Sequence, residues 1–476
     1  MLVVVLAPLP FGSVEPWAYS ALEVVVSILG LLYLYRLFLF PRTTPVKFSP
    51  LLLPGIGFLV LMGLQLVPLP PRLIQVLSPK TEALYEAALP GASEGTSATD
   101  KVDAAVLGKD YRAAPAWRTL SQVSFATRTY LMKGALFTLF LFLFLNSFRD
   151  PRQIQWVLFA FVVAGTFQAF YGVLEYLSGH QHIFSYQKKY YLDAATGTFI
   201  NRNHYAAFLE MTLLVALGLL FSGLREPQKG ESWRERLLAL TDRRASLNFT
   251  LLLCIGIVIV GLVLSYSRAG IILGLATSVC FCLIQLRQSW SLQKTLMIAL
   301  LVAVVLVPVY GVGYWTLTGR YALLTSEVTL PGGRMTVWRK TIEIVRDFPF
   351  TGTGVGTFQF VFPRYREAST KAIYDYAHCD YLQILSEAGV AGGVILTAGI
   401  LLVAGSWRRP ASSRPGAVLR SGCGFALLAV ALHEGVDFSL QIPANLLAAT
   451  LLVACLALLG NRELAGFGAS VEENHA

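Results

Sequence analysis

The sequence predicts an all-α integral membrane protein with about twelve transmembrane helices. Hydrophobic residues make up 55% of the 476 positions and charged residues only 14%, whereas soluble domains carry roughly 25% charged residues. Apolar runs of about 18 residues or more recur along the whole chain, and each is long enough to cross a bilayer as a helix. A membrane β-barrel would show short alternating strands instead. A helical bundle is therefore the architecture that the composition indicates.

Twelve candidate spans follow one another along the chain. They are predicted near residues 1–9, 17–36, 49–67, 127–147, 153–177, 204–222, 247–265, 269–286, 293–314, 380–406, 417–435 and 443–460. The first is too short to cross about 30 Å of hydrocarbon alone. Because it has an apolar core without preceding basic residues, it is more typical of a short first span than of a cleaved signal peptide.

Basic residues between the spans predict the orientation. Arginines and lysines such as Arg36, Arg152 and Arg408 follow the second, fourth, sixth, eighth and tenth spans. The positive-inside rule makes that side cytoplasmic, and both termini then lie there. We therefore expect one membrane domain over residues 1–476, with two long connections, 68–126 and 315–379, on the opposite side.

Charge and cysteine content exclude some classes of function. The net charge of +10 does not indicate nucleic-acid binding, because most basic residues lie in short loops where they report topology. None of the six cysteines forms a CxxC pair, which argues against a disulfide framework or a zinc site. No DxD or HExxH motif is present. We therefore expect no metal and no cofactor.

Residues 331–389 differ most from the apolar runs around them. They combine arginines, aromatic residues, a glycine-rich stretch and His378. MTVWRKTIEIVRDF is predicted to form an amphipathic helix, with Val337, Ile342, Ile344 and Val345 on its apolar side. PFTGTGVGTF lacks the strand and helix of a nucleotide-binding loop, so it is predicted to be a turn. A second helix should start near Tyr374, continue into the tenth span and hold His378 at the membrane surface.

Two arginines are candidates for binding an anion. Arg268, in SYSRAG, lies between two spans with almost no loop, and a guanidinium near hydrocarbon is usually paired or functional. Its planar fork suits phosphate oxygens, although a snorkelling arginine that anchors a helix end is the alternative. Arg334 begins the predicted loop helix, where the helix dipole favours an anion. The alternative there is a solvated charge, which is also the interpretation for Arg339 and Arg346.

His378 is the candidate general base. Neutral imidazole accepts a proton at physiological pH, and Asp375 and Asp380 are close enough in sequence to orient the ring. A histidine at the entrance of a span is otherwise often structural.

Five motifs occur in an order that is similar to a known family. They are GTFINRNHYAAFLEM at 197–211, SYSRAG at 265–270, GRMTVWRKTIEIVRDFPFTGTGVGTF at 333–358, AHCDYLQILSEAG at 377–389 and DFSLQIP at 437–443. The set closely resembles the O-antigen ligase family, which also includes O-antigen and exopolysaccharide polymerases and some pilin glycosyltransferases. The resemblance covers about residues 130–460.

The resemblance implies a polytopic inner-membrane glycosyltransferase of the GT-C class that acts at the periplasmic face. Its donor would be a glycan on undecaprenyl diphosphate. His378, Arg268 and Arg334 match the catalytic residues of the family. One departure is Cys379, where the family commonly has asparagine; Asp380 is retained. We expect four residues to contact substrate: Asn201, Asn203, Arg339 and Asp380.

The predicted function is metal-independent, inverting transfer of this glycan to an acceptor hydroxyl of lipid A–core. A polymerase that uses a second lipid-linked repeat as acceptor fits the sequence equally well. A transporter of lipid-linked glycan is an alternative of another class, although transporters usually place ionisable residues at mid-membrane. A non-catalytic assembly component with docking loops is a further alternative.

Overall fold

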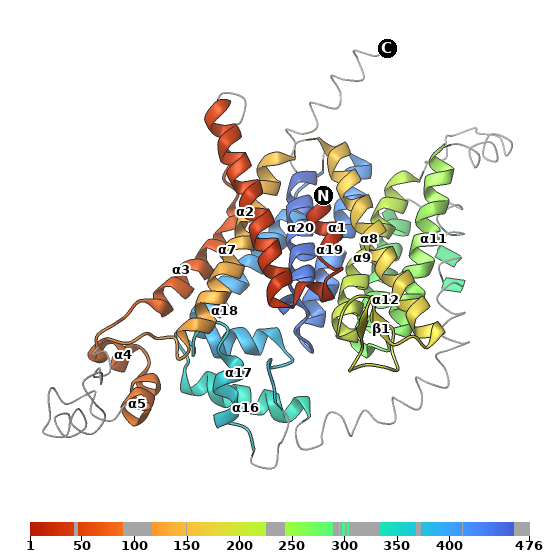
Figure 1. Ribbon diagram of the computed structural model, residues 1–476. Helices are drawn as coiled ribbons and strands as arrows, with labels where there is room; N and C mark the ends of the chain where they lie inside the picture. Colours follow the sequence, from red (N-terminus) through yellow and green to blue (C-terminus); the bar gives the residue numbers. More distant parts are fainter. Residues whose placement is uncertain are drawn as a thin grey trace, which may run out of the picture. The chain divides into compact units, whose positions relative to one another are not determined.

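The computed structural model describes residues 1–41, 46–88, 117–148, 150–224, 243–288, 295, 298–299, 302–303, 333–367, 373–411 and 413–460. The regular secondary structure of these residues is almost entirely helical (Figure 1). The helices are α1 (Leu2–Leu6), α2 (Pro16–Leu39), α3 (Leu53–Leu66), α4 (Pro71–Leu77), α5 (Pro79–Ala88), α7 (Ser124–Ser147), α8 (Pro151–Ser178), α9 (Arg202–Gly223), α11 (Arg243–Leu264), α12 (Arg268–Gln288), α16 (Arg334–Asp347), α17 (Phe358–Val361), α18 (Asp380–Arg408), α19 (Arg414–His433) and α20 (Pro443–Leu459). Two short strands, β1 (His182–Ile183) and β2 (Tyr186–Gln187), pair antiparallel.

Eight of the described helices are long and apolar enough to cross a membrane. They are α2, α7, α8, α9, residues Ser246–Leu264 of α11, α12, α18 and α19. They coincide with eight of the twelve predicted spans. The chain is therefore a multi-pass membrane protein, as its composition predicted.

The predicted number of about twelve spans is not confirmed. The expected span at 1–9 is wrong: its helix is only five residues long, because Pro8 and Pro10 follow it and proline cannot continue a helix. Pro50–Leu66 and Pro443–Leu459 are shorter apolar helices, at the lower limit of the length that crosses a bilayer. The span expected at 293–314 lies almost entirely outside the described residues.

The chain divides into two compact units. Unit 1 comprises Met1–Pro50, Leu136–Leu324 and Leu401–Ala476, and unit 2 comprises Leu51–Ala135 and Thr325–Ile400. Of the loops expected at 68–126 and 315–379, residues 89–116, 315–332 and 368–372 lie outside the described part of the chain.

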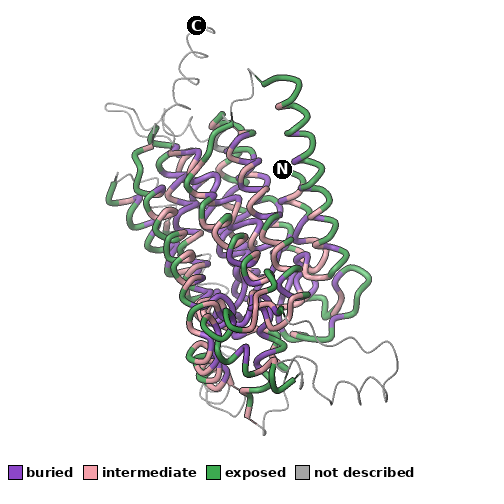
Figure 2. Tube along the Cα trace, turned by 90° about the vertical axis from the view of Figure 1, so that its left-hand side faces the viewer, coloured by how far each residue is buried: buried purple, intermediate pink, exposed green. Residues whose placement is uncertain are grey.

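Helix α9 is the core of unit 1. It packs against α8, α11, α12 and α19 (Figure 1), and most of its residues are buried. Small residues allow this close packing, since a Cβ on Gly218 would lie 3.1 Å from the Cα of Gly422 in α19. Small residues at helix contacts are typical of membrane bundles. In contrast, most of the apolar side chains of α2 are exposed, and such exposed positions recur along the long helices (Figure 2).

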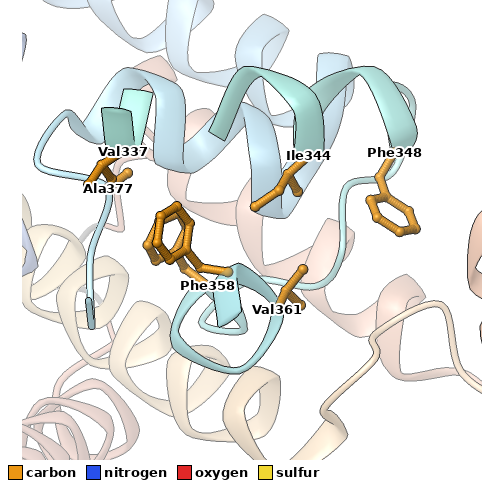
Figure 3. Close-up of a cluster of buried hydrophobic side chains, with 7 residues drawn as sticks. Val337, Ile344, Phe348, Phe358, Val361 and Ala377 are labelled. Carbon is orange, nitrogen blue, oxygen red and sulfur yellow. The ribbon is translucent and has the colours of Figure 1, made fainter. Parts of the chain in front are cut away.

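Helix α16 and the segments after it form a small core in unit 2. Its members come from three stretches of the chain and are Val337, Ile344, Phe348, Phe358, Val361, Phe362 and Ala377 (Figure 3). The predicted helix over MTVWRKTIEIVRDF is confirmed within one residue at each end. Its apolar side is narrower than expected, because Ile342 is 39% exposed.

The second helix does not start near Tyr374. Helix α18 begins at Asp380, and His378 has a left-handed backbone conformation with φ of 53°. A residue in this conformation cannot continue a right-handed helix. The expectation that a helix holds His378 is therefore wrong, and the residue lies in the turn before α18.

Candidate functional site

His378 is held by contacts to its backbone. The indole Nε1 of Trp338 donates a hydrogen bond of 3.2 Å to the carbonyl oxygen of His378. The backbone N–H of Ala377 donates to Oε1 of Gln383 at 3.0 Å. The half-buried His378 ring lies edge-on to Tyr374, with ring centroids 6.3 Å apart. The peptide group after His378 and the N–H of the residue before it are thus tied to other elements of unit 2.

Arg334 is connected to His378 through α16. It is the first residue of the helix, after Gly333, and it lies four residues before Trp338. Residues four apart share one helix face. Arg334 therefore lies one helical turn from the side chain that binds the His378 carbonyl. Within unit 2, α16 thus connects Arg334 to the backbone of His378.

The glycine-rich turn packs onto α18 next to a bend of this helix at Gly389. Gly352, Gly354 and Gly356 all have positive φ, and a Cβ on Gly352 would lie 2.2 Å from the carbonyl oxygen of Glu387. The Glu387 carboxylate accepts hydrogen bonds from the backbone N–H groups of Gly356 at 2.8 Å and Phe358 at 2.9 Å. The predicted turn is confirmed, but the sequence interpretation missed Glu387 as its anchor.

Asp380 and Cys379 lie immediately after His378. Both are buried, and Asp380 is the first residue of α18. Burial raises the pKa of the Cys379 thiol, although hydrogen bonds from the backbone of Leu382 and Tyr381 partly oppose this. Burial also raises the pKa of Tyr376, which is hydrogen-bonded to Tyr130. Cys379 is therefore a neutral thiol near neutral pH. Asp375, unlike the buried Asp380, is exposed.

Arg268 starts α12 in unit 1, directly after a tight turn. Tyr266 in this turn has a φ of 50°. The hydroxyl of Ser265 donates to the carbonyl of Leu262 at 2.6 Å and accepts from the N–H of Ser267 at 3.1 Å. Oγ of Ser267 accepts from the N–H of Gly270 at 3.4 Å. The serines of SYSRAG thus shape the backbone on either side of Arg268. This role explains two motif residues whose function the sequence left open.

Asn201 and Asn203 form hydrogen bonds at the start of α9. Asn201 is the N-cap, and its side chain accepts from the N–H of Asn203 at 2.8 Å. The Asn203 amide donates to Oδ2 of Asp437 at 2.5 Å. Nε2 of the buried His204 lies 3.8 Å from Oδ1 of Asp437. This arrangement joins the NRNHY and DFSLQIP motifs.

A buried carboxylate–histidine pair lies within unit 1. Oε1 of Glu210 is 2.7 Å from Nδ1 of His433, and both side chains are fully buried. A Cβ on Gly270 would lie 3.1 Å from the same Glu210 oxygen, so the pair adjoins the first turn of α12. The sequence interpretation missed the pair, although an ionisable residue within a span is itself a signal of a polar site.

Arg339 is exposed on α16, as is Arg346. Among the described residues, no three His, Cys, Asp or Glu side chains gather closely enough to hold a metal ion.

The fold and these residues define a multi-pass helical membrane protein with polar clusters at helix ends. Residues 251–397 match the family model described as O-antigen ligase (Wzy_C). The chain is thus a membrane protein with an O-antigen ligase family domain, a domain found in membrane ligases and polymerases of lipid-linked glycans. Arg268, Arg334 and His378 all lie within the matched residues. None of the curated proteins matches the chain.

Proposed function

We propose that the protein transfers a glycan from undecaprenyl diphosphate to an acceptor hydroxyl. The observation that carries the proposal is the connection within unit 2 of Arg334, a cation at a helix start, to His378, a candidate base, through Trp338. The O-antigen ligase match over residues 251–397 supports the class of donor.

In the proposed reaction His378 takes the proton of the acceptor hydroxyl. The acceptor oxygen attacks the anomeric carbon, while the bond from this carbon to the diphosphate oxygen breaks and its electrons pass to the diphosphate. Because attack comes from the face opposite the leaving group, the anomeric configuration inverts. A positioned general base contributes about 10²–10⁴-fold to such a step.

Arg334 stabilises the charge that develops on the leaving diphosphate. A guanidinium at a helix start combines its own charge with the dipole and free N–H groups of the helix. We propose the same role for Arg268, since it also begins a helix. Arg339 and Asp380 remain our proposed substrate contacts. Asn201 and Asn203 are also proposed to contact substrate, in addition to shaping the start of α9.

We propose the bacterial inner membrane as the location, with the site facing the periplasm. For the acceptor we propose lipid A–core, and the alternative is a second lipid-linked repeat. A deletion strain separates the two: polymer that stays on its undecaprenyl carrier indicates a ligase, whereas single repeats without polymer indicate a polymerase.

The test of the base is His378→Ala in that deletion strain. We expect glycan transfer to fall about 10²–10⁴-fold while the protein stays in the membrane at its normal level. Transfer at the normal rate would refute the assignment. Arg268→Ala and Arg334→Ala are tested separately, and each should weaken use of the diphosphate donor.

A purified protein that transfers glycan from lipid diphosphate excludes the transporter and the non-catalytic assembly component. If the purified protein only moves the donor across a bilayer, the enzyme proposal is wrong.

A further inference from the structure

The conformation of His378 requires support from its surroundings. A φ of 53° is uncommon for a residue with a side chain. Such a conformation persists only where neighbouring structure enforces it, and it is often found at functional sites. His378 precedes α18 and is not part of it, so the regular geometry of a helix does not set its conformation.

Two side chains supply it from opposite directions along the chain. Trp338 of α16 donates its indole N–H to the His378 carbonyl at 3.2 Å. Gln383 of α18 accepts from the Ala377 N–H at 3.0 Å. Together they fix the backbone of Ala377, directly before the histidine, and the peptide group directly after it. Ala377 is also fully buried in the core formed with Val337 (Figure 3).

Gln383 is itself immobilised. Its side chain is 1% exposed and is hydrogen-bonded to the Glu387 carboxylate. That carboxylate also accepts from Gly356 and Phe358. A continuous set of hydrogen bonds thus runs from the glycine-rich turn through Glu387 and Gln383 to the backbone of Ala377, the residue before His378.

We propose that Trp338 and Gln383 are positioning residues for the proposed base His378. This inference rests on the proposed function. Trp338 acts on the histidine backbone and Gln383 on that of the preceding Ala377. Together they set the direction in which the imidazole points, while the proton transfer itself belongs to His378. A displacement of about 1 Å in a reacting group can cost 10²-fold in rate, so loss of either contact should reduce turnover.

The experiment uses the purified full chain in lipid nanodiscs, with undecaprenyl-diphosphate-linked glycan as donor and lipid A–core as acceptor. Trp338→Phe keeps an aromatic ring but loses the N–H, and Gln383→Met keeps the length but loses the hydrogen bonds. We expect each to lower kcat about 10- to 100-fold with KM for the donor unchanged. The matched control is Thr341→Val, which removes a buried hydrogen bond of α16 to Val337 without touching His378, and it should keep kcat.

A second arm combines each substitution with His378→Gln. Residues that act through one group are not additive with its loss. We therefore expect Trp338→Phe and Gln383→Met to cause no further loss in the His378→Gln protein. A further 10-fold loss in that background, or an unchanged kcat in the single variants, overturns the positioning role. If the His378→Gln protein transfers glycan normally, His378 is not the base and the proposed function fails. This outcome differs from those that refute only the positioning role of Trp338 and Gln383.

Discussion

Arg268 and Arg334 both begin helices, but the two units hold these helices in different ways. Helix α12 of unit 1 packs closely against α9, where a Cβ on Gly270 would lie 2.6 Å from that of Ala206. In unit 2, side chains bind the irregular backbone near α16, as Glu387 does at the glycine-rich turn. Neighbouring helices suffice where the backbone is hydrogen-bonded within a helix, whereas the buried N–H groups of irregular backbone need partners from other parts of the chain.

The buried carboxylates of the two units show the same difference. Glu210 in unit 1 pairs with a side chain, His433, and fastens α9 to the end of α19. Glu387 in unit 2 pairs with backbone N–H groups and fastens a turn to α18. One carboxylate thus joins two helices, and the other makes an irregular segment rigid.

The largest effect is expected for Glu210→Ala. Removing one member of a buried pair leaves its partner unsatisfied, which typically costs about 3–5 kcal/mol. The free energy of unfolding, measured by titration with SDS in mixed micelles, should fall by this amount. Glu210→Gln keeps an acceptor for His433 and should lose less. If the Ala and Gln variants are equally stable, the pair does not join the two helices as described.

A smaller loss is expected for Glu387→Gln. The amide keeps one acceptor oxygen, so one of the two backbone N–H groups loses its partner. A buried donor without a partner costs about 1–3 kcal/mol. Limited proteolysis of residues 349–358 should become faster, while proteolysis of unit 1 stays unchanged. Equal acceleration in both units would mean that Glu387 does not act locally on the turn.

The smallest effect is expected for Lys340→Ala. Lys340 forms a pair with Glu343 at 2.9 Å on the surface of α16. Such exposed helix pairs contribute about 0.3–0.5 kcal/mol. The free energy of unfolding should change by no more than this, in contrast to both buried carboxylates. A fall of about 2 kcal/mol in the free energy of unfolding would exceed what an exposed pair provides. It would show that surface charge also stabilises unit 2.

The sequence predicted the helices better than it predicted the irregular backbone between them. Eight spans and α16 follow from apolar runs and helical periodicity, which are local signals. The start of α18 was misplaced by several residues, because the left-handed conformation of His378 is stabilised by Trp338, which is 40 positions away. The polar pair of Glu210 and His433 was missed for the same reason, since its members are 223 positions apart.

The sequence by itself determined that the chain is a multi-pass helical protein and named Arg268, Arg334 and His378 as candidates. Hydrophobic length and residue chemistry are properties of short segments, so no tertiary contact is needed to infer them. Only the tertiary structure decided which side chains hold these candidates. Serines hold the Arg268 turn, and Trp338 and Gln383 hold His378. Such contacts join distant parts of the chain, and their hydrogen bonds form only once the helices pack together.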